Sequence, residues 1–119
     1  MMIRPETLRE RTKQFALRVI RLSRALPKTE ESRVIGRQLL RAATSVAANY
    51  RAACRARSRA EFTAKTGIVL EESDESLFWL ELLGEAGIIR KARLTSLMQE
   101  AEELTRIFYS SIQTSRRKS

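Results

Sequence analysis

Apolar residues recur at steps of three and four along almost the whole chain, the spacing that places side chains on one face of a helix. In the first run, with Thr12 taking one apolar position, these are Leu8, Thr12, Phe15, Val19, Leu22 and Leu26. Three further runs follow. Together they predict helices over approximately residues 7–26, 30–57, 59–85 and 90–114.

The boundaries between these runs carry residues that typically start or stop helices. Pro27 disfavours helical angles in the residue before it, and Thr29 can then cap the second helix. Ser58 and Glu61 form the S-x-x-E pattern of a helix start. Gly87 accepts left-handed angles cheaply and indicates that the third helix has ended.

The two ends of the chain are less sharply marked. Thr7 and Glu10 form a possible capping box, whereas Pro5 would start the first helix earlier. Residues 115–119 are predicted to be a frayed basic tail. Short connections between helices of similar length favour antiparallel neighbours. We therefore expect an all-α, single-domain chain (residues 1–119) folded as an antiparallel up-down-up-down four-helix bundle.

Composition agrees with this fold class and bounds the compartment. Only 4 Gly and 2 Pro occur among 119 residues, as expected of a helical chain. No run of about 18 uncharged apolar residues is available for a membrane span. The first residues lack the apolar core of a secretion signal. We expect no membrane partner and a cytoplasmic location.

The residues required for most enzymatic chemistry are missing. There is no His, and Cys54 is the only cysteine, so Ser-His and Cys-His catalysis and the usual zinc sites are excluded. The acids at residues 71–75 lack the His and the matching buried Glu of a di-metal bundle site. We expect no enzyme activity, no metal and no cofactor, and Cys54 is interpreted as a small buried side chain.

Charge is segregated along the sequence. Residues 1–65 carry 16 Lys or Arg against 5 acids, residues 66–115 carry 4 against 9, and residues 116–118 add three cations to reach the net charge of +9. Six arginines in and just after the predicted second helix lie opposite its apolar face. We call them the arginine row and predict that they bind nucleic-acid phosphates: Arg33, Arg37, Arg41, Arg51, Arg55 and Arg59. A solvated charged face is the alternative.

The predicted third helix carries a second apolar line, outside its core face. This Trp79 stripe combines apolar and acidic residues in the manner of a protein contact surface: Ile68, Glu72, Glu75, Trp79 and Leu82, flanked by Phe78. The alternative is a wide core face in which Trp79 covers an edge of the bundle. We expect Glu72 and Glu75 of one copy to meet arginines of the next, a head-to-tail contact that closes into a ring.

Three further polar residues are predicted to have structural roles. Asn49 lies near Ser45 beside the core face, where buried hydrogen bonds would fix the helix register. Lys65 is expected to pair with Glu72 or with a neighbouring helix.

The same residues resemble a known family, the bacterial four-helix-bundle proteins encoded in intervening sequences of 23S ribosomal RNA genes. Relatives include the accessory protein of diversity-generating retroelements. The resemblance covers nearly the whole chain and rests on the order and spacing of Leu26-Pro27, Gln38 to Ala42, Ser45, Asn49, Phe62, Lys65 and Glu71 to Glu75.

This resemblance implies a homopentamer around a central channel, without known enzymatic activity. In the retroelement relatives a basic surface binds nucleic acid and the reverse transcriptase. One departure is that the family pattern often has Glu and then Gly shortly after the Asn, where this chain has Ala52 and Ala53. The sequence thus favours a ring-forming, RNA- or DNA-binding bundle. The alternative is a purely structural or protein-interaction oligomer whose arginines serve subunit contacts.

Overall fold

The computed structural model describes residues 3–118 and contains four helices there, with no strand in that range. They are α1 (Pro5–Arg24), α2 (Glu30–Ala53), α3 (Arg59–Glu85) and α4 (Lys91–Arg117). The all-α prediction is confirmed, and the elongated shape of 47 × 23 × 19 Å is consistent with a bundle. No helix in the described range is long and apolar enough to cross a bilayer.

Two of the predicted caps are present. The Thr29 hydroxyl accepts a hydrogen bond from the Ser32 N–H at 3.2 Å, and the Ser58 hydroxyl accepts one from the Glu61 N–H at 3.0 Å. Gly87 has a φ of 72°, as expected for the residue that ends α3. The first helix begins at Pro5, and Arg4 before it provides no side-chain cap. The sequence predicts these caps correctly because each one involves residues within a single helical turn.

The chain differs from the predicted boundaries by two residues at each end of α1, and by more at the ends of α2 and α4. Helix α2 ends at Ala53 because the N–H groups of Arg55 and Ala56 donate three residues back, to Ala52 and Ala53, in a tighter turn. Helix α4 continues to Arg117, so residues 115–117 are helical rather than a frayed tail. Ser115 is buried there. Residues 1, 2 and 119 of the predicted domain lie outside the described residues.

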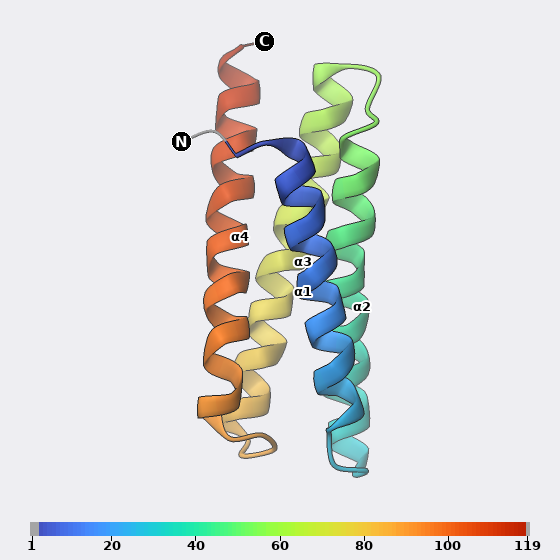
Figure 1. Cartoon of the computed structure of the whole chain (residues 1–119), viewed down its shortest axis with the longest axis vertical. Coiled ribbons are helices and arrows are strands. Elements are labelled where there is room, and N and C mark those ends of the chain that lie inside the picture. Colours follow the sequence, from blue (N-terminus) through green and yellow to red (C-terminus); the bar gives the residue numbers. More distant parts are fainter. Residues whose placement is uncertain (1–2, 119) are drawn as a thin grey trace.

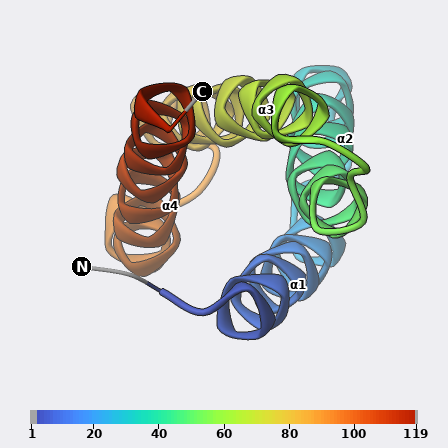
Figure 2. The same ribbon diagram turned by 90° about the horizontal axis from the view of Figure 1, so that it is seen from above.

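Figure 1 follows the chain along the long axis of the molecule. The chain descends through α1, returns through α2, descends through α3 and returns through α4, so both termini lie at the end that holds the α2–α3 connection. Seen along the axis, the helices occupy the corners of a square in chain order (Figure 2). The α1–α4 side of this square is the most loosely packed.

The core lies inside this square and draws on all four helices. Leu39, Val46, Leu80 and Leu104 are fully buried, and Tyr50 packs against Phe108 with ring centroids 5.2 Å apart. Burial raises the pKa of Tyr50. Ala42, Ala43 and Ala53 are also buried, and their small side chains allow the neighbouring helix to approach closely.

Hydroxyl groups interrupt the core face of α3. Ser73 Oγ lies 3.0 Å from Thr105 Oγ1 of α4, and Ser76 donates to the carbonyl oxygen of Glu72 at 2.8 Å. Thr66 is different. Its side chain is fully buried, and its hydroxyl has no hydrogen-bond partner among the described residues. An unsatisfied buried hydroxyl loses its hydration without compensation.

Replacing Thr66 by Val is therefore expected to stabilise the fold. The substitution keeps the side-chain shape and removes the unpartnered hydroxyl, which corresponds to about 1–2 kcal/mol in the free energy of unfolding. Urea denaturation followed by circular dichroism measures the change. Thr105→Val is the matched control, because it deletes a hydroxyl that bonds to Ala101 and Ser73, and it should destabilise. A loss of stability in T66V equal to that in T105V would contradict the assignment.

Candidate nucleic-acid and subunit interfaces

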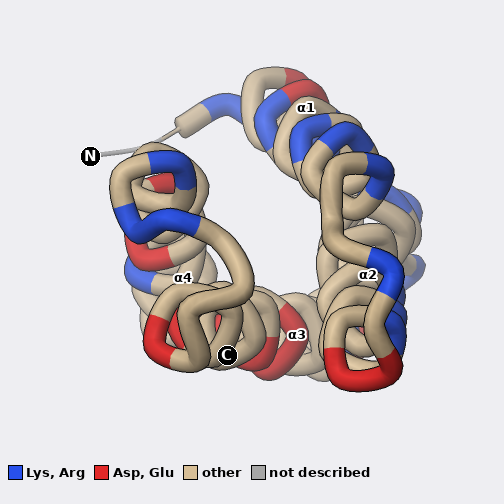
Figure 3. Tube along the Cα trace, turned by 90° about the horizontal axis from the view of Figure 1, so that it is seen from below, with Lys and Arg blue, Asp and Glu red and all other residues tan. Residues whose placement is uncertain are grey.

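The arginine row runs along the outer face of α2, opposite the buried Leu39 and Val46, continues with Arg55 in the α2–α3 connection and ends at Arg59, the first residue of α3. Its members at residues 33, 37, 51 and 55 are exposed, and they form no ion pair with any described residue. Figure 3 shows cations along α1 and α2 and acids along α3. The segregation of charge along the sequence is therefore also a segregation in space. Four unpaired guanidinium groups on one face are suited to phosphate contacts.

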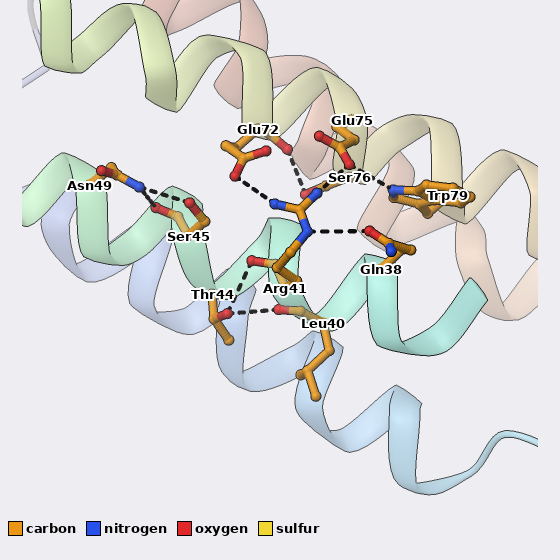
Figure 4. A network of polar contacts seen from close by, with 10 residues as sticks. All are labelled: Gln38, Leu40, Arg41, Thr44, Ser45, Asn49, Glu72, Glu75, Ser76 and Trp79. Atoms are coloured by element: carbon orange, nitrogen blue, oxygen red, sulfur yellow. Dashed lines mark hydrogen bonds and ion pairs between the residues drawn. The ribbon is translucent and has the colours of Figure 1, made fainter. Parts of the chain in front are cut away.

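Arg41 is the member of the row with carboxylate partners. Its Nη1 donates to Glu72 Oε2 at 2.9 Å, its Nη2 to Glu75 Oε1, and its Nε to Gln38 Oε1 at 3.2 Å (Figure 4). The hydrogen bond to Glu75 raises the pKa of Arg41 above its ordinary value. Arg41 thus links α2 to α3 within one chain.

Glu72 and Glu75 were predicted to meet arginines of a second copy. In the structure Arg41 of the same chain engages both of them. The reason is geometric, because α2 and α3 lie side by side and bring positions 31 and 34 residues apart in sequence into contact. Two carboxylates around one guanidinium leave one net negative charge at this point of the surface.

Glu75 is held in its charged form by two donors. Desolvation alone would raise its pKa, but hydrogen bonds from Trp79 and Arg41 outweigh it, so the pKa of Glu75 lies below its usual range. The indole Nε1 of Trp79 donates to Glu75 Oε1 at 3.2 Å. Trp79 is thereby fixed against α3, and it is only partly buried.

The apolar members of the Trp79 stripe differ in exposure. Ile68 and Phe78 are 45% and 49% exposed, whereas Trp79 and Leu82 are half-buried and Trp79 packs against the core. The rings of Phe78 and Trp79 meet edge to face, with centroids 5.0 Å apart. Trp79 is therefore the partly covered aromatic side chain of the stripe. Phe78 is the more accessible aromatic side chain.

Val34 is an exposed apolar residue that the sequence pattern did not single out. It is 53% exposed and lies seven residues before Arg41 on nearly the same side of α2. Since α2 and α3 run in opposite directions in Figure 1, Val34 lies toward the part of α3 that carries Phe78 and Leu82. The signal available was its place beside Arg41 on a helical projection. Only the bonds of Arg41 to α3 show that this side of α2 lies next to α3.

One end of the molecule gathers cations from two separate parts of the sequence. Arg59 Nη1 donates to the carbonyl oxygen of Lys118, and the Thr63 and Ser115 hydroxyls lie 2.6 Å apart, which ties the end of α4 to the start of α3. The α2–α3 connection lies at the same end (Figure 1). We call this region the basic end: Arg55, Arg57, Arg59, Arg116, Arg117 and Lys118. Arg59 of the arginine row belongs to it.

The predicted structural polar residues are placed differently from the expectation. Asn49 Nδ2 donates to the Ser45 carbonyl oxygen at 2.9 Å and to Ser45 Oγ at 2.7 Å, so its bonds stay within α2 and do not fix register between helices. Lys65 forms no ion pair within the described range. Residues 3–118 contain no group of three or more side chains able to hold a metal ion.

The family model of 23S rRNA-intervening sequence proteins matches residues 7–110. The chain is also similar to a crystal structure of a protein of unknown function from the S23 ribosomal protein family of Bacteroides thetaiotaomicron. The two are 33% identical with a TM-score of 0.82, over 88% of this chain and 97% of the other. No curated protein matches the chain.

The hydrogen bonds to Glu75 make a pH-dependent contribution to stability. A carboxylate whose folded-state pKa is lowered stabilises the fold above the ordinary glutamate pKa of about 4.3. That contribution is lost as the pH falls through the lower folded-state value. We expect Glu75→Gln to cost up to about 1 kcal/mol at pH 7, and the difference from the parent protein to shrink below about pH 4.

Urea denaturation at a series of pH values measures this difference. Glu71→Gln is the control, because Glu71 is exposed on the same helix and has no ion-pair partner in the described structure. A pH-independent cost of E75Q would mean that packing, and not charge, accounts for it.

Proposed function

The chain belongs to the family of 23S rRNA-intervening sequence proteins, and we propose that it is a non-enzymatic, nucleic-acid-binding homo-oligomer. In this proposal antiparallel four-helix bundles assemble head to tail into a ring of five copies, the number that the resemblance implies. Self-association uses the apolar part of the Trp79 stripe. Nucleic acid binds to the arginine row and the basic end.

Self-association is supported by the apolar surface of α3. Ile68 and Phe78 are each nearly half exposed, which leaves apolar area in water on the same helix. Gly67 beside them has no steric role within the chain, since a Cβ there would meet nothing within 4 Å. Glycine in the middle of a helix costs about 1 kcal/mol relative to alanine. A second copy packed closely on this face would account for both features.

Nucleic-acid binding is supported by the number of cations without acidic partners. In the described structure carboxylates engage only three arginines: Arg4, Arg11 and Arg41. The arginine row apart from Arg41, together with the cations of the basic end, is the observation that carries the proposal. These groups lie on one side and one end of the molecule, where a phosphate backbone can meet several of them at once.

The competing function is a purely structural or protein-interaction oligomer. Arg41 favours it, because the structure shows an arginine of the row already engaged in a protein contact. If subunit contacts engage the other arginines as well, none is left for phosphates. The oligomeric state of arginine variants therefore separates the two functions.

Replacing Phe78 and Ile68 by Ser is expected to dissociate the oligomer. Both side chains are exposed in the single chain, so the substitutions remove intermolecular contacts at little cost to the fold. Multi-angle light scattering measures the mass, and circular dichroism confirms the helical content. Tyr109→Ser is the control, because Tyr109 is 57% exposed on α4. A monomeric parent protein at about 10 micromolar would refute the ring.

Binding of a single-stranded RNA is expected to weaken steeply with salt. For about four phosphate contacts, affinity for the single strand should fall roughly 50-fold between 50 and 200 mM salt. Replacing Arg37, Arg51 and Arg55 by Gln should lower affinity and reduce the salt slope by about one per arginine lost. Fluorescence anisotropy with RNA and DNA oligonucleotides measures both quantities.

The matched control for this experiment replaces Arg90, Lys91 and Arg93 by Gln. It removes the same charge from exposed positions around the start of α4. Equal losses in both triple variants would indicate an unspecific effect of net charge. If the row variant instead loses its oligomeric state and the parent never binds RNA or DNA, the competing function is correct.

A further inference from the structure

A groove opens between α1 and α4 at the basic end, and the fold gives a reason for it. Helix α1 has 20 residues and α4 has 27, so about 10 Å of α4 has no α1 beside it at 1.5 Å per residue. In Figure 1 the upper part of α4 extends past the start of α1. Pro5 begins α1, and Arg4 before it is extended. The groove is the space that a longer α1 would fill.

The groove has room for about two turns of a helix. It encloses about 690 Å³ between the start of α1, the first turn of α3 and the last turns of α4. Its lining on α4 runs from Glu103 to Lys118, about 22 Å along the helix axis. A compact small molecule would use only part of this length. About two turns of an α-helix would fill the roughly 10 Å of α4 that α1 leaves uncovered.

The chemistry of the lining is amphipathic and basic. Leu8, Phe62 and Ile107 give it an apolar floor, on which Leu8 is buried and the other two are half-buried. Hydroxyl groups follow along α4 at Ser110 and Ser111. This combination suits a ligand that is itself apolar on one side and polar on the others.

The charges around the floor select the sign of that ligand. Arg106 and Lys118 have no ion-pair partner in the described structure, and the guanidinium of Arg59 bonds only to a carbonyl oxygen. Glu103 is the one acid of the lining, and Arg11 neutralises it at 3.1 Å. Three cations therefore face an apolar floor without acids to balance them.

We propose that this groove binds an acidic amphipathic helix of a partner protein, lying where a longer α1 would continue. Its apolar side covers Leu8 and Ile107, and its carboxylates meet Arg106 and Lys118. Phosphates gain nothing from an apolar floor, and Phe62 alone provides a ring for stacking bases. The projecting end of α4 in a second copy carries Arg116, Arg117 and Lys118, which the cations of the groove would repel. The proposed function also uses Arg59 and Lys118, so the acidic helix and nucleic acid would compete for this part of the basic end.

The probe is a fluorescein-labelled helical peptide of about 14 residues, with Leu at i, i+3, i+4 and i+7 and Glu on both flanks. A companion peptide carries Lys in place of every Glu. We expect micromolar binding of the acidic peptide to the full chain by fluorescence anisotropy, and at least a tenfold preference over the basic one. The double variant Arg106→Glu, Lys118→Glu should lose about tenfold or more in affinity.

The control double variant is Arg90→Glu, Arg93→Glu, which changes the net charge equally but lies outside the groove lining. It should bind the acidic peptide as the parent does. The proposal is overturned if neither peptide binds at about 100 micromolar, or if both double variants lose equally. It is also overturned if R106E/K118E abolishes RNA binding while peptide binding is absent, because the occupant is then nucleic acid. Dissociation of the oligomer by R106E/K118E, again without peptide binding, assigns the groove to a second copy.

Discussion

Three short connections of equal length determine which helices are neighbours in this bundle. Residues 25–29, 54–58 and 86–90 join successive helices with five residues each. Connections this short place each helix beside the one before it in the chain. Only the pair α1 and α4 has no covalent connection. It is also the most loosely packed pair, and it relies on side-chain contacts such as Arg11 with Glu100 at 2.6 Å.

The loose packing between α1 and α4 and the shorter length of α1 together leave one end of the bundle open. The start of α1, the α2–α3 connection and the end of α4 converge there, and each brings cations. Like charges at close range repel, so this cluster of cations destabilises the fold until an anionic partner neutralises it. The same end holds the groove with its apolar floor. The end of the bundle that holds both chain termini is therefore also the surface that attracts anions most strongly.

The contact between α2 and α3, in contrast, is closely packed. Buried alanines allow the two helices to approach closely, and Arg41 ties them on the outside by bonding to Glu72 and Glu75. Because of these ion pairs, one cation of the arginine row and two acids of the Trp79 stripe already have partners within the chain. What remains exposed is an apolar surface around Phe78 on one helix and unpaired arginines on the other. Self-association and nucleic-acid binding can then use different side chains of neighbouring helices.

The sequence by itself determined the four helices, most of their boundaries and the core faces. Thr29, Ser58 and Gly87 act within one turn, and the apolar spacing of each run shows which side of a helix is buried. Family membership was also recognisable, since it depends on order and spacing. The contacts of Asn49 and the end of α4 were predicted less well, because a side chain can bond to its own helix as easily as to another.

Only the tertiary structure decided which charges are paired and where the surface is open. The partners of Arg41 lie 31 and 34 residues away, and Lys118 meets Arg59 across 59 residues. No local pattern encodes such distances. The groove depends on the difference in length between α1 and α4, which becomes a cavity only when the two helices lie side by side. Helical periodicity is a property of neighbours in sequence, whereas ion pairs and grooves are properties of neighbours in space.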